Sequence, residues 1–354
     1  MTMVSVLMPE HAPPAKATTP TRVDPSVTAL GAVELNRGPV GDIAATGTGA
    51  ALVTHPGDDS VAVLNARTLA VEAIIAVHGE PFAVAVHEDR AYVSTSSWSH
   101  KDEVAVIDTA TKTVIGAYPL SENVTALAVS PDGKRVYAGR TGDGHIDVAV
   151  IDIPADRVDT IDVATGAGIG IDALAIDASG THLHVATTDA RGSAVVTVDL
   201  ETGRLGRAVR IGAPIRDIAV ADDTAYVLSS DRTRGGVVHV VELSTGRVTD
   251  IVELGGAPTQ LVVGADKARA YIVDYDHVVV LCTLTLQVVD TIAVGARPSC
   301  VTVDAHAGRM YVADYAGGVT VFAADSTMPL LYPQFAATDP IVAAEIRELE
   351  PVTA

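Results

Sequence analysis

Residues 82–119 read FAVAVHEDRAYVSTSSWSHKDEVAVIDTATKTVIGAYP, and this unit of four short apolar segments separated by turns recurs along the chain. Each copy contains an apolar triplet, and the triplets begin at Ile43, Val84, Leu127, Leu174, Ile218, Leu261 and Val301. The intervals between them are 41, 43, 47, 44, 43 and 40 residues. A period near 40 residues with strand-like alternation is typical of a radial array of four-stranded blades. The repeat therefore predicts an all-β fold, a seven-bladed β-propeller.

The quoted copy also shows the four strands of one blade. We expect strands a to d at Phe82–His87, Ala91–Thr95, Val104–Asp108 and Thr113–Pro119, because Val, Ile and Tyr alternate there with small or polar residues. Antiparallel strands place the d–a and b–c loops on one side of the ring, here called the loop face. The a–b and c–d turns then lie on the opposite turn face. Since the loops of the loop face vary more in length, we expect function on that face.

The two ends of the chain must close the ring. Thr28–Leu35 resembles the expected d strand Val288–Val294, which indicates a d strand displaced to the N-terminus. We expect it to pair beside Val319–Phe322 and complete the last blade, and Met328–Tyr332 is the competing candidate for that position. The predicted organisation is a disordered tail at 1–25, the propeller at 26–332, and a tail with a short helix at 333–354.

Composition narrows the possible partners. The 354 residues are 48% hydrophobic and 4% aromatic, and the formal net charge is -20. Such a surface repels phosphate backbones, so we expect no nucleic-acid binding. Cys282 and Cys300 lie in apolar strands and are expected to be buried thiols. No convincing export signal or membrane span is present, so we expect a cytoplasmic monomer, with an exported or envelope-associated protein as the alternative.

Several motifs recur together and resemble a known family. Strings of the same kind as Tyr92-Val93-Ser94-Thr95 occur at Tyr226-Val227-Leu228-Ser229 and Tyr311-Val312-Ala313-Asp314. They resemble the signature of the YVTN-repeat, or YncE-like, seven-bladed β-propellers over residues 28–325. That family is distantly similar to lactonase-type and quinoprotein amine dehydrogenase-like propellers. Its members have mixed activities, so the resemblance implies a fold and no particular reaction.

Candidate binding residues gather in the expected b–c loops. Trp98 and His100 lie in the longest of these, Ser94–Glu103, where Trp98 either anchors a ligand or packs its own loop. Four arginines indicate an anion-binding sector, unless neighbouring Asp residues neutralise them. These are Arg140, Arg191, Arg232 and Arg234.

Two further sets complete the candidates. Asp274-Tyr275 and Asp314-Tyr315 occupy equivalent places in adjacent blades, either as a hydrogen-bonding rim for a ligand or as repeated turns. A second set opens strand a and is expected around the mouth of an axial funnel, where Asp42 and Asp217 either pair or stay solvated. Its members are Asp42, Phe82, Asn123, Asp172, Arg216, Asp217, Gln260 and Ser299.

Motifs for catalysis are missing from the sequence. His55, His100 and His145 follow strand b in the first three blades but lack short ligand spacing, so no metal or cofactor is predicted. Neither a Gly-x-Ser-x-Gly elbow nor a Walker A loop occurs. The expected function is therefore non-catalytic binding of a protein or peptide through the loop face. The alternative is a lactonase-like hydrolase or a quinoprotein-like oxidoreductase subunit that uses the axial funnel.

Overall fold

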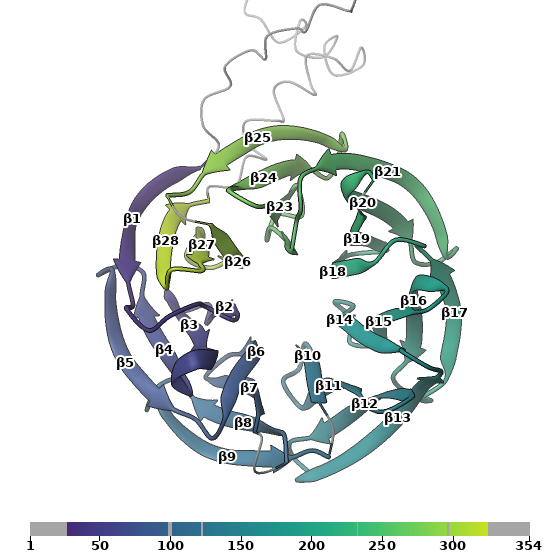
Figure 1. Ribbon diagram of the computed structural model, residues 1–354. Coiled ribbons are helices and arrows are strands. Elements are labelled where there is room, and N and C mark those ends of the chain that lie inside the picture. Colours follow the sequence, from purple (N-terminus) through teal and green to yellow (C-terminus); the bar gives the residue numbers. More distant parts are fainter. Residues whose placement is uncertain (1–26, 98–100, 122, 232, 296, 325–354) are drawn as a thin grey trace, which may run out of the picture.

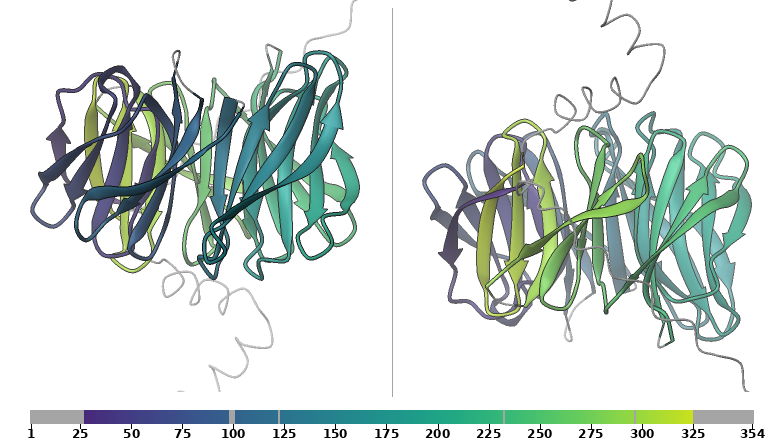
Figure 2. Two further views of the ribbon diagram at one scale, coloured as in Figure 1. Left: turned by 90° about the horizontal axis from the view of Figure 1, so that it is seen from below. Right: turned by 90° about the horizontal axis from the view of Figure 1, so that it is seen from above.

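A computed structural model describes residues 27–97, 101–121, 123–231, 233–295 and 297–324. Over these residues the chain forms seven four-stranded antiparallel sheets arranged as a ring around an axis (Figure 1). Seen from the side, the connections emerge on two opposite faces (Figure 2). The predicted all-β seven-bladed propeller is confirmed.

The first four blades hold these strands. Blade one contains β2 (Ile43–Ala45), β3 (Ala50–His55), β4 (Ser60–Asn65) and β5 (Ala70–Ala76), with the 3-10 helix η1 (Pro56–Asp58) after β3. Blade two contains β6 (Glu80–His87), β7 (Arg90–Ser96), β8 (Glu103–Asp108) and β9 (Thr113–Pro119). Blade three contains β10 (Asn123–Val129), β11 (Arg135–Thr141), β12 (His145–Asp152) and β13 (Arg157–Thr165). Blade four contains β14 (Gly170–Ile176), β15 (His182–Asp189), β16 (Gly192–Asp199) and β17 (Leu205–Arg210).

The remaining blades follow the same order. Blade five contains β18 (Ile215–Ala221), β19 (Thr224–Asp231), β20 (Gly235–Glu242) and β21 (Arg247–Gly255). Blade six contains β22 (Gln260–Val263), β23 (Arg269–Val273), β24 (His277–Cys282) and β25 (Gln287–Ala293). Blade seven combines β26 (Pro298–Asp304), β27 (Arg309–Asp314) and β28 (Gly318–Ala323) with β1 (Thr28–Glu34) from the N-terminal side of the chain.

Strand β1 closes the ring as its fourth strand. It pairs antiparallel with β28, with Val33 opposite Val319, and the Leu35 N–H donates to the Gly317 carbonyl at 3.0 Å. The N-terminal closure predicted from the sequence is therefore confirmed. The competing segment 328–332, the two predicted tails and the predicted C-terminal helix lie outside the described residues.

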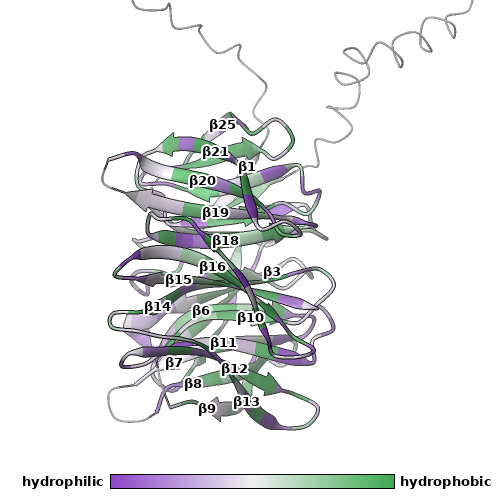
Figure 3. Ribbon diagram, turned by 90° about the vertical axis from the view of Figure 1, so that its right-hand side faces the viewer, coloured by the Kyte–Doolittle hydropathy of each residue, from purple (hydrophilic) through white to green (hydrophobic). Residues whose placement is uncertain are grey.

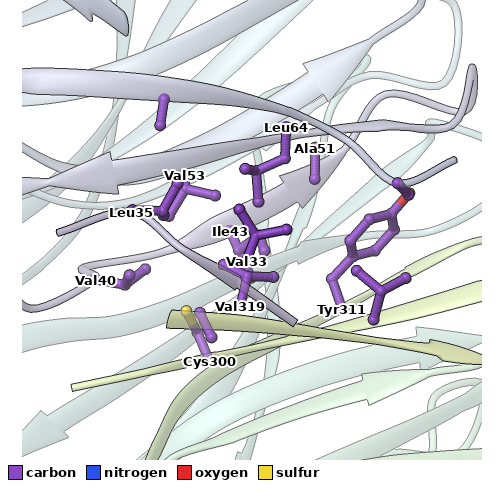
Figure 4. Packing of buried hydrophobic residues seen from close by; sticks show 14 residues of the cluster. Val33, Leu35, Val40, Ile43, Ala51, Val53, Leu64, Cys300, Tyr311 and Val319 are labelled. Atoms are coloured by element: carbon purple, nitrogen blue, oxygen red, sulfur yellow. The ribbon is translucent and has the colours of Figure 1, made fainter. Parts of the chain in front are cut away.

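The hydrophobic core lies between blades. Most strands carry hydrophobic residues along their length (Figure 3). The strand-b tyrosines of five blades are buried, and one cluster joins blade seven to blade one through Val33, Ile43, Leu64, Tyr311 and Val319 (Figure 4). Burial of this apolar surface stabilises the closed ring, at about 25 cal/mol for each square ångström. Both cysteines are buried free thiols, as expected.

The repeated Asp and Thr after strand c are turn residues. In blade two the Thr111 N–H donates to Asp108 Oδ1 at 2.7 Å, and in blade four the Thr202 N–H donates to Asp199 Oδ1 at 2.8 Å. Side-chain acceptors of this kind close turns by replacing a backbone partner. These repeated carboxylates of the turn face therefore have a structural role.

Candidate functional site

A cavity of about 350 Å³ lies on the axis, lined by residues that open strand a of successive blades. Strand a begins next to the d–a loop, so this cavity lies on the loop-face side of the ring. Three predicted site residues, Asp42, Arg216 and Asp217, line it together. Phe82, Asp172, Gln260 and Ser299 also line it as expected, whereas Thr125 replaces Asn123 in the lining.

Asp42 connects three blades at this cavity. Its Oδ1 accepts from its own neighbour, the Ile43 N–H, at 2.9 Å and from Gln260 Nε2 of blade six at 3.2 Å. Its Oδ2 accepts from the Val84 N–H of blade two at 3.0 Å. The carboxyl group therefore joins blades one, two and six through hydrogen bonds that only the closed ring brings together.

Asp217 repeats the arrangement on blade five. Its Oδ1 accepts from the Ile218 N–H and its Oδ2 from the Leu261 N–H of blade six, both at 2.8 Å. Gln260 extends the series, because its Oε1 accepts from the Val301 N–H of blade seven at 2.7 Å. These side chains hold neighbouring blades together at the axis. Their roles in ligand binding stay predictions.

The environment of the two aspartates favours their neutral forms. Burial raises the pKa of Asp42 from 3.8 to about 6, although the hydrogen bonds from Val84, Ile43 and Gln260 oppose it. Burial also raises the pKa of Asp217 to about 7, and the charge of Asp42 raises it further. Carboxyl groups that titrate near neutrality are suited to proton transfer, although structural carboxyl groups titrate there as well.

Asp172 and Arg216 complete the charged wall of the cavity. Thr188 Oγ1 donates a hydrogen bond to Asp172 Oδ2. Burial raises the pKa of Asp172, while the Thr188 hydrogen bond and the positive charge of Arg216 lower it. The cavity therefore offers carboxyl, guanidinium, amide and hydroxyl groups to a small polar molecule.

The titration of Asp217 predicts a pH dependence of stability. Because its folded pKa of about 7 exceeds the ordinary value of 3.8, the folded protein holds a proton that the unfolded chain releases. The free energy of unfolding should therefore fall as the pH rises from about 4 to about 7, by roughly 3 kcal/mol for this group. Asp217→Asn removes the titration, so its slope of Tm against pH over this window should be smaller than in the wild type.

The matched control for this experiment is Asp132→Asn on the turn face. Hydrogen bonds from Ser130 and Lys134 lower the pKa of Asp132 to about 2, so its titration lies outside the window. Differential scanning calorimetry at several pH values gives both slopes. A slope for Asp217→Asn equal to that of the wild type would show that Asp217 is not the group responsible.

A rim of aromatic and cationic side chains lies at blades six and seven. The Arg297 guanidinium carbon lies 4.4 Å from the centroid of the Tyr275 ring. The Tyr315 N–H donates to the Arg297 carbonyl at 3.0 Å, so Arg297 connects the b–c loops of two blades. Tyr275 and Tyr315 are 54% and 52% exposed, respectively. We call Tyr275, Arg297 and Tyr315 the aromatic rim.

The aspartates beside these tyrosines act in turns. Asp274 Oδ1 accepts from the Ala257 and Tyr275 N–H groups, both at 2.7 Å. Asp314 Oδ1 accepts from the Ala316 N–H at 2.8 Å and the Gly318 N–H at 2.9 Å. The Asp314 carboxylate thus accepts within its own turn, as the repeated-turn interpretation expects, whereas the Asp274 carboxylate also joins its b–c loop to the d–a loop at Ala257. Both tyrosine rings remain exposed.

Of the four predicted arginines, the structure describes Arg140, Arg191 and Arg234. Arg140 is buried and holds Asp147 through two hydrogen bonds, Nε to Oδ1 at 2.6 Å and Nη2 to Oδ2 at 2.9 Å. Arg191 is exposed beside a smaller cavity of about 180 Å³, and Arg234 is exposed in blade five. Arg232 lies outside the described residues, as do Trp98 and His100. The guanidinium of Arg140 therefore faces an internal carboxylate.

Two of the three histidines, His55 and His145, lie in the part of the chain that the structure describes. His55 is fully buried in blade one, where burial lowers its pKa. His145 begins β12 of blade three. Within the described ranges, no group of three or more His, Cys, Asp and Glu residues could hold a metal ion. The same ranges contain no helix long and apolar enough to cross a membrane.

Sequence reasoning missed Arg297 and Thr125. Arg297 precedes Pro298 in a d–a loop, and its position over the Tyr275 ring depends on contact between two blades. Thr125 Oγ1 donates to the Ile171 carbonyl of blade four at 2.9 Å. A hydroxyl among the apolar residues of strand a was the available signal for Thr125, whereas no local pattern indicated Arg297.

Comparisons with known proteins agree with this architecture. The model of the family described as "Lactonase, 7-bladed beta-propeller" matches residues 60–211. A seven-bladed beta-propeller protein of Mycolicibacterium smegmatis is 53% identical over 312 residues, which cover 88% of this chain and 84% of that protein. The seven-bladed beta-propeller protein Rv1057 of Mycobacterium tuberculosis is 35% identical over 291 residues, covering 72% of this chain and 74% of that protein.

Solved structures show the same fold at lower identity. A chain of Kuenenia stuttgartiensis hydrazine synthase superposes with a TM-score of 0.71 at 19% identity, covering 86% of this chain and 98% of that one. The Cps50 (Swd1) β-propeller domain of Myceliophteria thermophila superposes with a TM-score of 0.70 at 11% identity, covering 84% of this chain and 99% of that one. At these identities the likeness concerns the fold alone.

Proposed function

This chain belongs to the family of seven-bladed β-propeller proteins, and we propose that it is a non-catalytic scaffold that binds a protein or peptide through its loop face. The aromatic rim is the observation that carries this proposal. Tyr and Arg are the residue types most often found at the energetic centres of protein interfaces. Here the Arg297 guanidinium lies over the half-exposed Tyr275 ring, and a backbone hydrogen bond joins Arg297 to Tyr315, whose ring is also half exposed.

The geometry of the rim favours binding of a partner. Arg297 is already placed over the Tyr275 ring, so less side-chain entropy is lost when a partner contacts both groups. The two tyrosines offer large apolar surfaces with polar ends, which suit a peptide that carries both apolar and polar side chains. The axial aspartates support the same view, because backbone N–H groups of neighbouring blades occupy their oxygens.

A peptide-display selection tests this proposal. Peptides selected on the immobilised wild type should bind the double variant Tyr275→Ser, Tyr315→Ser at least about tenfold more weakly, because removal of both rings deletes the central contact surface. Fluorescence polarisation with labelled peptides measures this change. A parallel Trp98→Ala variant tests the tryptophan that the sequence singled out.

The control is a pair of exposed apolar residues remote from the loop face. Val114→Ser, Ile115→Ser removes two residues of the outer strand β9 that are 42% and 51% exposed. This variant should bind the selected peptides as the wild type does. Peptides that bind the tyrosine double variant with unchanged affinity would refute the proposed surface.

A second candidate is a lactonase-like hydrolase that uses the axial cavity. It is favoured by the family match over residues 60–211 and by two carboxyl groups that titrate near neutrality. In this candidate Asp217 acts as the general base for water, and Arg216 polarises the substrate carbonyl. Hydrolysis of simple lactones that is lost in Asp217→Asn, measured by proton release, would favour it over partner binding.

The proposal also includes a subgroup, an oligomeric state and a cellular location. The tyrosine-containing repeats support membership of the YVTN-repeat subgroup. A monomeric state and a cytoplasmic location accompany the scaffold role. Light scattering and cell fractionation test the latter two.

A further inference from the structure

A second cavity, of about 500 Å³, lies on the turn face between blades seven, one and two. Its wall combines the a–b turn of blade one, at residues 46–50, with Arg67 and Glu72 of the same blade. Lys112 enters from the c–d turn of blade two and Arg309 from strand b of blade seven. Cavities of 300 to about 1,000 Å³ are typical of small-molecule sites.

The lining of this cavity carries more positive than negative charge, although the whole protein has a net charge of -20. Three cations, Arg67, Lys112 and Arg309, face one carboxylate, Glu72. Glu72 is already paired, because Lys112 Nζ lies 2.7 Å from its Oε2 and Asn65 Nδ2 donates to its Oε1 at 2.6 Å. The hydrogen bonds from Lys112 and Asn65 also lower the pKa of Glu72, so the group is ionised at neutral pH.

Over the ranges that the structure describes, the guanidinium groups of Arg67 and Arg309 lack partners in different ways. Nη1 of Arg309 is inaccessible to solvent and has no hydrogen-bond partner in the part of the chain that the structure describes. No ion pair of the Arg67 guanidinium occurs among the described residues, and only the backbone N–H of Arg67 is bonded, to Asn65 Oδ1. Because Nη1 is closed to solvent, only the part of Arg309 that lines the cavity meets a ligand there, together with the exposed Arg67 side chain.

We propose that this cavity binds the phosphate group of a small molecule. Three positive charges and one negative charge leave the lining with a net charge of +2, which matches a phosphate monoester at about -1.5 to -2 at pH 7. Guanidinium groups bind such oxyanions with paired hydrogen bonds. The polar residues Thr46, Thr48 and Thr109 line the same space.

The carboxylate of Asp304 is not counted in the net charge of the lining. It is fully buried and is not part of the lining. Its Oδ2 accepts from the Gly49 N–H at 3.1 Å, and its Oδ1 accepts from the His306 and Ala307 N–H groups at 2.9 Å. Its carboxylate oxygens thus accept from three backbone N–H groups, two of which belong to the lining residues Gly49 and Ala307.

The repeat provides a matched cavity in blades four and five. This space of about 550 Å³ has Arg204, Arg207 and Asp199 in its lining. None of its lining residues carries a buried side-chain nitrogen or oxygen without a partner, within the described ranges. The lining at blade one carries a net charge of +2, from three cations and one carboxylate, against +1 in the cavity of blades four and five, from two cations and one carboxylate. The larger positive charge and the unpartnered guanidinium nitrogen therefore distinguish the cavity at blade one.

Isothermal titration calorimetry with inorganic phosphate and glucose 6-phosphate tests the proposal on the full chain. At pH 7.5 the wild type should bind both, and Arg67→Gln should weaken binding at least about tenfold, because an exposed arginine is removed without loss of core packing. Arg204→Gln should bind as the wild type does. Arg309→Gln, checked for unchanged Tm, should lose binding as well.

Three results would overturn the assignment. The first would be that the wild type binds neither inorganic phosphate nor glucose 6-phosphate. The second would be that Arg204→Gln loses as much affinity as Arg67→Gln, which would indicate a diffuse charge effect. Alternatively, citrate binds more tightly than both phosphate compounds, which would identify a carboxylate site. None of these results bears on the loop-face scaffold, because the two surfaces lie on opposite faces of the ring.

Discussion

Val33→Asp is expected to destabilise the closed ring by more than about 4 kcal/mol, since it places an unpaired charge in the core. Val33 lies in β1, is 8% exposed, and packs in the cluster that joins blade seven to blade one. Strand β1 is the fourth strand of blade seven, and its pairing with β28 closes the ring. A carboxylate at this position removes apolar contacts from both partner blades at once.

Leu30, three residues before Val33 on β1, provides the control. It is 45% exposed, so Leu30→Asp should change the free energy of unfolding by less than about 1 kcal/mol. Urea unfolding followed by circular dichroism measures both variants, and gel filtration detects an open or aggregated ring. A Val33→Asp protein as stable as Leu30→Asp would show that β1 is not required for closure.

Arg140→Leu is expected to cost about 3–5 kcal/mol, because it leaves the buried carboxylate of Asp147 without its partner. Both residues are buried, and Nε and Nη2 of Arg140 hold the two carboxylate oxygens at 2.6 and 2.9 Å. Arg140 Nη2 also donates to Thr160 Oγ1 at 3.2 Å. The double variant Arg140→Leu, Asp147→Leu should recover most of the loss, since no buried charge then remains.

A double-mutant cycle by urea unfolding measures this coupling. The exposed pair Lys134–Asp132, with 3.4 Å between Nζ and Oδ2, is the comparison, and Lys134→Leu should cost less than about 1 kcal/mol. If the Arg140 and Asp147 variants behave additively, the pair contributes no specific stability.

The fold was predictable because its signals are local. Alternation of apolar and polar residues defines each strand, the period near 40 residues defines a blade, and seven periods define the ring. The resemblance of Thr28–Leu35 to a d strand was enough to predict closure by β1. Even the axial cavity followed from strand order, since Asp42 and Asp217 occupy equivalent positions at the start of strand a in blades one and five.

The side-chain partners were not predictable in the same way. Nothing near Arg140 in the sequence distinguishes Asp143 from Asp147 as its partner, because the choice depends on the pairing of β11 with β12. Both interpretations of Asp274-Tyr275 fitted the sequence, and only the structure shows that the Asp274 carboxylate accepts from the backbone N–H groups of Ala257 and Tyr275.

Sequence alone thus determined the seven blades, their strand order and the two faces, because hydrophobic periodicity is a property of neighbouring residues. Tertiary structure decided which polar groups meet. Gln260 and Asp42 are 218 residues apart, and closure of the ring brings them within 3.2 Å. The cavity at Arg67 and Arg309 likewise forms only where blades seven, one and two converge. Such contacts depend on how blades pack around the axis, and that packing has no local signature in the chain.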